Sequence, residues 1–120
     1  MGRLQDDFLI RVETFCDRVL DVTEAAARAR CPRRLIEQIA AAGTSVGANA
    51  FEADEAMSRA DFAKSLSIVM KELNETRFWL RLVARRGWVA PGRLDSLLAE
   101  ADELRRIVGT MITRTRQNTP

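Results

Sequence analysis

The chain has 120 residues, of which 47% are hydrophobic and 30% are charged. This length predicts a single domain over residues 1–120 that buries its core without a disulfide or a metal ion. The composition excludes a disordered chain. A formal net charge of +2 is too small to predict a polyanionic partner by itself. Since no apolar run is long enough for a membrane span and no signal-peptide core is found, we expect a cytoplasmic protein without membrane contact.

Apolar residues at alternating three- and four-residue steps divide the chain into four predicted helices. The first is expected over residues 6–30, with Asp6 and Asp7 placing negative charge where the helix dipole favours it. Cys31-Pro32 predicts its end, because proline disfavours helical geometry in the preceding residue.

The second helix is expected over residues 32–53, with Pro32 as a first-turn residue. Gly43 and Gly47 lie four residues apart on its apolar face. Each glycine inside a helix costs about 1 kcal/mol relative to alanine. We therefore expect a neighbouring helix to approach this face closely.

The third helix is expected over residues 59–86, after an S-x-x-D capping box that begins at Ser58. Gly87 is a suitable left-handed cap at its end. Its predicted core seam consists of Phe62, Leu66, Val69, Leu73, Thr76, Leu80 and Val83. The fourth helix is expected over residues 91–115, with Pro91 in its first turn.

No stretch alternates with the period of a strand, so the fold class is all-α. The connections are short, and consecutive helices joined by short connections pack as antiparallel neighbours. The sequence therefore predicts an up-down-up-down antiparallel four-helix bundle.

The residue types argue against an enzyme. The chain has no histidine, which removes the commonest general base and metal ligand, and it has no glycine-rich phosphate loop. Cys16 and Cys31 are expected to be unpaired structural thiols. Glu72 and Glu75 share a helix face and could pair as acid and base, but contact with arginines or water is the simpler interpretation. We expect no catalytic residues, cofactor or metal.

Arginines gather at one end of the predicted bundle, which favours contact with a nucleic acid backbone. Helix dipoles offer a second explanation, because cations are favoured at helix C-termini. The candidate nucleic-acid-binding residues are Arg28, Arg30, Arg33, Arg34, Arg85, Arg86 and Arg93.

Trp79 lies outside the seam of the third helix, on a second stripe with Ile68, Glu72, Glu75 and Leu82. An apolar second stripe indicates either a wide core or a contact between subunits, and tryptophan is favoured at interfaces. We interpret this stripe as an interface. Trp88, in contrast, is expected to close the end of the bundle.

The chain resembles the bacterial four-helix-bundle proteins encoded by intervening sequences of large-subunit ribosomal RNA genes. The resemblance extends over about residues 8–113. It is carried by Ser45, by Gly47-Ala48-Asn49, by Glu52, by Ser58-x-x-Asp61-Phe62, by Leu66-Ser67-Ile68 and by Gly87-Trp88-Val89. Here Ala50-Phe51-Glu52-Ala53 replaces the family's Ile-Ala-Glu-Gly pattern.

This resemblance implies a homo-oligomer, with a pentamer favoured, and no established enzymatic activity. Relatives include the accessory variability determinant of diversity-generating retroelements, which binds nucleic acid and a reverse transcriptase. Ser45, Asn49, Glu72 and Glu75 are expected to form a polar network inside or between protomers, with Trp79 at the oligomer interface.

Two functions are therefore expected. The first is a non-enzymatic, self-associating bundle that acts as an interaction or scaffold protein. The alternative is a nucleic-acid-binding accessory protein, associated with RNA or with a reverse transcriptase, that uses the arginine-rich end.

Overall fold

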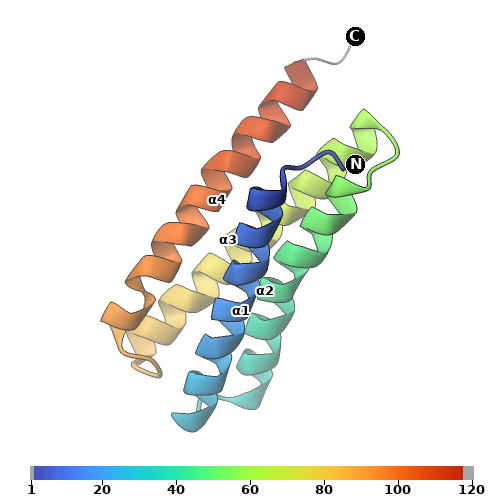
Figure 1. Ribbon diagram of the computed structural model, residues 1–120. Helices are drawn as coiled ribbons and strands as arrows, with labels where there is room; N and C mark the ends of the chain where they lie inside the picture. Colours follow the sequence, from blue (N-terminus) through green and yellow to red (C-terminus); the bar gives the residue numbers. More distant parts are fainter. Residues whose placement is uncertain (1, 118–120) are drawn as a thin grey trace.

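The computed structural model describes residues 2–117 and contains four antiparallel helices joined by short turns (Figure 1). They are α1 (Asp6–Arg28), α2 (Arg33–Asp54), α3 (Arg59–Arg86) and α4 (Pro91–Gln117). No strand occurs in the described part of the chain. The predicted all-α, up-down-up-down four-helix bundle is confirmed, and the molecule measures 51 × 21 × 20 Å.

The core is formed by the apolar seam that each helix turns inward. The seam predicted for α3 is confirmed, since it is buried from Leu66 to Val83 and Phe62 packs partly buried at its edge. The largest fully buried side chains are Phe15, Ile39, Leu66, Leu73, Leu80, Leu94 and Leu104. Every helix contributes to this list, so the core extends along the whole bundle.

The fourth side of the bundle, between α1 and α4, is much less closely packed than the other three. A fork of two hydrogen bonds crosses it, in which Arg11 Nε and Nη2 donate to Glu100 Oε2 and Oε1 at 2.9 and 2.8 Å. Further along, Arg18 Nη2 donates to Ser96 Oγ at 2.5 Å. Polar bridges thus replace part of the apolar packing on this side.

Helix α1 ends at Arg28, two residues before the predicted end. The reason is a left-handed turn at Arg30, where φ is 66°. The Cys31 N–H donates to the Ala26 carbonyl at 3.0 Å, and the Arg30 N–H donates to Ala27 at 3.1 Å. These two bonds form a Schellman motif, with an arginine at the position usually taken by glycine.

Arg30→Gly is expected to raise the free energy of unfolding by about 0.5–1 kcal/mol, because glycine adopts positive φ without the Cβ clash. Urea unfolding followed by circular dichroism would measure the change. Arg28→Gly is the control, since this residue is still helical and the same substitution there should be destabilising. A loss of stability in Arg30→Gly would contradict this account of the turn.

The other differences from the predicted bounds are small. Pro32 is the N-cap residue of α2, with an extended ψ of 134°, and is not a residue of the first turn as predicted. Helix α2 extends one residue further than predicted, to Asp54, and α4 extends two residues further, to Gln117. In these places backbone hydrogen bonding continues past the last clear apolar signal.

Helix α3 has the two predicted caps. The Asp61 N–H donates to Ser58 Oγ at 3.0 Å, and Gly87 is left-handed with φ of 75°. Both caps supply partners to backbone groups that lack them at a helix end. They fix where the long α3 begins and ends.

The close approach predicted for Gly43 and Gly47 is confirmed. A Cβ atom on Gly43 would lie 2.5 Å from Val19 Cγ1, and one on Gly47 would lie 2.8 Å from Cys16 Sγ. Both distances are shorter than real contacts of a Cβ atom. The two glycines therefore allow α1 to lie directly against α2.

Candidate functional site

The arginine-rich end is formed by two turns, α1–α2 and α3–α4, which lie at the same end of the bundle (Figure 1). The antiparallel topology therefore brings the predicted group together. All its members are exposed, and they are Arg28, Arg30, Arg33, Arg34, Arg85, Arg86 and Arg93.

Few of these arginines have a partner. Within residues 2–117, Arg33 alone in this group has a carboxylate within 4.0 Å, that of Glu37, and both side chains are largely exposed. The Arg86 guanidinium lies 5.4 Å from the centre of the Trp88 ring. Trp88 itself is half-buried against the core. The arrangement leaves most of the positive charge free to meet an anion.

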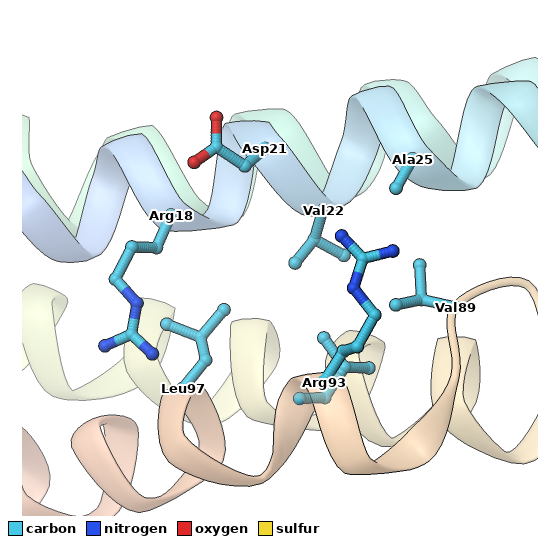
Figure 2. Close-up of a pocket in the computed structure, with 8 residues that line it drawn as sticks. Arg18, Asp21, Val22, Ala25, Val89, Arg93 and Leu97 are labelled. Carbon is cyan, nitrogen blue, oxygen red and sulfur yellow. The ribbon is translucent and has the colours of Figure 1, made fainter.

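Arg93 also lines a cavity of about 150 Å³ between α1 and α4 (Figure 2). Arg18 lines the same cavity from α1, and its guanidinium extends toward α4 (Figure 2). Arg18 was not among the predicted residues. Its position on the loosely packed side of the bundle depends on how α4 lies against α1, which helical spacing alone does not reveal.

The predicted polar residues form two pairs, each within its own helix. Asn49 Nδ2 donates to the Ser45 carbonyl at 2.8 Å in α2. Trp79 Nε1 donates to Glu75 Oε2 at 3.2 Å in α3. All four residues are half-buried. Among the described residues no hydrogen bond joins the two pairs, and a network between them remains a prediction.

Glu72 is half-buried beside the second pair. Burial raises the pKa of its carboxyl above 4.5, and the charge of Glu75 raises it further, against a smaller opposing effect of Lys71. Ionised Glu72 therefore opposes folding at neutral pH, because its charge is better solvated in the unfolded chain.

Glu72→Gln is expected to stabilise the protein at pH 7. A raised pKa in the folded state favours folding below the unfolded value of 4.5, and this contribution is lost as the pH rises through the folded pKa. The advantage of the variant should therefore shrink as the pH falls toward about 4. Urea unfolding at both pH values measures it, with exposed Glu24→Gln as the control. Equal stabilisation by Glu72→Gln at the two pH values would contradict a raised pKa of Glu72 in the folded protein.

The outer face of α3 carries an apolar and basic stripe, which we call the α3 ridge. Its members recur at three- and four-residue steps and are Lys64, Ile68, Lys71, Glu75, Phe78, Leu82 and Arg85. Phe78 is 55% exposed. Its ring packs edge-on against the Trp79 ring, with 5.3 Å between the ring centres. Phe78 was missed as a site residue because it lies on the outer face of α3, away from the core seam. The spacing of buried apolar residues does not identify residues on that face.

The two cysteines have structural positions. Cys16 Sγ donates to the Gly43 carbonyl at 3.2 Å, and Cys31 is buried in the core cluster. Burial raises the pKa of both thiols, so each is a weaker nucleophile at neutral pH than a free cysteine.

None of the described helices combines the length and the apolar character that crossing a membrane requires. Across residues 2–117, no group of three histidine, cysteine, aspartate or glutamate side chains is arranged to hold a metal ion.

Comparison with known proteins agrees with the fold. A solved structure from Bacteroides thetaiotaomicron VPI-5482, a protein of unknown function from the S23 ribosomal protein family, is 30% identical to this chain. The similarity covers 88% of this chain and 97% of the other, with a TM-score of 0.82. No curated protein matches the chain.

The family comparison covers most of the bundle. The model of the 23S rRNA-intervening sequence protein family matches residues 9–110, from the first turn of α1 into the last third of α4. Neither this family description nor the solved relative indicates a catalytic activity. The chain belongs to the 23S rRNA-intervening sequence protein family.

Proposed function

We propose that this protein is a non-enzymatic, self-associating module that forms a homo-oligomer, with a pentamer favoured, and acts as an interaction or scaffold protein. The observation that carries the proposal is the α3 ridge. Its apolar members are Phe78, more than half exposed, and half-buried Ile68 and Leu82, and the half-buried Trp79 ring packs edge-on against Phe78 beside them. Apolar groups gathered in this way are typical of a protein interface.

The molar mass in solution tests this function. A protomer has a mass of 13.5 kDa, and light scattering coupled to gel filtration should give a multiple of it, about fivefold for a pentamer. On dilution, the measured mass should fall only at concentrations low enough for the oligomer to dissociate. A mass of one protomer at every concentration would refute self-association.

The half-buried amide of Asn49 is expected to set how copies fit together, because a polar group at an interface specifies register at some cost in stability. Asn49→Leu should therefore change the size or the uniformity of the oligomer. Sedimentation velocity would show a broadened or shifted distribution. An unchanged profile would remove Asn49, and with it the pair that it forms with Ser45, from the proposed interface.

A second function, as an accessory protein bound to RNA or to a nucleic acid enzyme such as a reverse transcriptase, is favoured by one feature of the arginine-rich end. Arg33 and Arg34 lie in the first turn of α2 and Arg93 in the first turn of α4, and neither turn contains an acidic residue. A cation at a helix N-terminus opposes the dipole by about 0.3–1 kcal/mol. Dipole matching therefore does not account for these positions, whereas a phosphate backbone would.

Charge reversal tests the second function. A variant with glutamate at Arg30, Arg33, Arg34 and Arg86 should bind RNA and DNA at least about tenfold more weakly at low salt, with a shallower salt dependence. Fluorescence anisotropy would measure both. The matched control reverses exposed Arg114 and Arg116 at the other end of α4. Equal binding by the wild type and the first variant would end this proposal.

A further inference from the structure

A groove between α1 and α2 lies apart from both surfaces described above. It has a volume of about 400 Å³. Leu20 and Phe51 line it and are 36% and 42% exposed. Cys16 and Gly47 line it where the two helices approach closely. The small residues that bring α1 against α2 thus also leave space for an apolar side chain from outside.

The edges of this groove are acidic. Glu13 and Asp17 line it directly from α1. Helical spacing continues their row through Leu20 to Glu24, and the row of Phe51 on α2 continues to Glu55. All four carboxylate side chains are exposed. A partner that fills the groove is therefore expected to carry apolar groups flanked by positive charge.

The α3 ridge has this character. Exposed Phe78 lies between Lys71 and Arg85 on the same helix face, and Lys64 continues the row. Glu75 is the one acidic member of the ridge, and its carboxylate is held by the indole of Trp79. Lys64 and Lys71 are also the only lysines in the chain. The ridge and the groove are thus complementary in both apolar character and charge.

We propose that the α3 ridge of one copy docks into the α1–α2 groove of a second copy. The two faces lie on different helices, and Figure 1 shows α3 behind α1 and α2. A protomer can therefore use one face toward each of two neighbours, which generates a ring or a chain. If two ridges paired, Lys64, Lys71 and Arg85 of one copy would face the same positive charges of the other. If two grooves paired, their acidic edges would face each other.

This inference rests on the proposed self-association and adds the direction of the contact, head-to-tail. A mixing experiment tests it. Phe51→Glu blocks the groove and leaves the ridge intact, and Phe78→Glu, which sets a carboxylate against the acidic edges, blocks the ridge and leaves the groove intact. Both side chains are exposed, so we expect both variants to fold, with circular dichroism as the check. Each variant alone should have the 13.5 kDa mass of a protomer.

An equimolar mixture of the two variants should form a dimer of twice that mass and nothing larger, because one intact ridge meets one intact groove and the remaining faces are both blocked. The milder pair Phe51→Ala and Phe78→Ala repeats the test with smaller changes. Met57→Lys is the control, since Met57 is 91% exposed in the α2–α3 turn, outside both faces. It should keep the mass of the wild type.

The results separate the two proposals. A monomeric wild type would refute self-association itself. A wild-type oligomer that survives either substitution, or a mixture of folded variants that stays monomeric at concentrations where the wild type is fully assembled, would leave self-association standing and overturn the head-to-tail pairing of these faces.

Discussion

Replacing Phe15 with alanine is expected to lower the free energy of unfolding by about 3–5 kcal/mol. Phe15 is the largest of the fully buried side chains and belongs to the single core cluster. Truncation loses the transfer free energy of the ring and leaves a cavity that the surrounding core collapses only in part to fill. Urea unfolding at one fixed protein concentration measures the loss, because the proposed self-association would make stability depend on concentration.

Thr14→Ala is the control for Phe15→Ala. Thr14 precedes Phe15 in the same helix and is exposed, so its substitution should change stability by no more than about 0.5 kcal/mol. A loss below about 1 kcal/mol for Phe15→Ala would mean that the interior repacks freely and that the bundle lacks a well-defined core.

Gly43→Ala is expected to be destabilising by about 1–2 kcal/mol, although alanine is the better helix former by about 1 kcal/mol. The new Cβ would lie 2.5 Å from Val19 Cγ1 and 3.0 Å from Val19 Cβ. Since Val19 is fully buried, it has no room to move away, and α1 and α2 must separate. Thermal or urea unfolding measures the result.

Three further variants make this test specific. Val19→Ala removes the clashing methyl groups, so the double variant should be more stable than the two single losses predict, by at least about 1 kcal/mol. Gly109→Ala in α4 is the matched control, because its Cβ would lie 3.5 Å from Met70 Cε, an ordinary contact. It should be stabilising by up to about 1 kcal/mol. Additive losses at Gly43 and Val19 would disprove the close approach.

Much of the fold could be predicted because local signals and burial agree. The seam of α3 and its caps at Ser58 and Gly87 appear where the sequence places them. The end of α1 was less accurate because Arg30 adopts a left-handed conformation that is rare outside glycine. No preference of arginine predicts such a turn, and the turn places Cys31 in the core.

The candidate surfaces were predictable in part. The arginines could be placed at one end because antiparallel topology follows from short connections. Phe78 and Arg18 were missed, since one lies outside the buried seam and the other faces α4 across the loosely packed side. The groove that contains Leu20 and Phe51 was also missed, because it exists only where two helix faces meet.

The sequence by itself determined the four helices, their order, the side of each that is buried and the glycines of α2 that allow a neighbouring helix to approach closely. These depend on periodicity and residue size, which are local properties of the chain. Only the tertiary structure decided that the loosely packed α1–α4 side is bridged by Arg11 and Glu100, and that an acidic groove and a basic α3 ridge form separate surfaces. Those features depend on the distances and angles between helices, and such geometry follows from the packing of all side chains together.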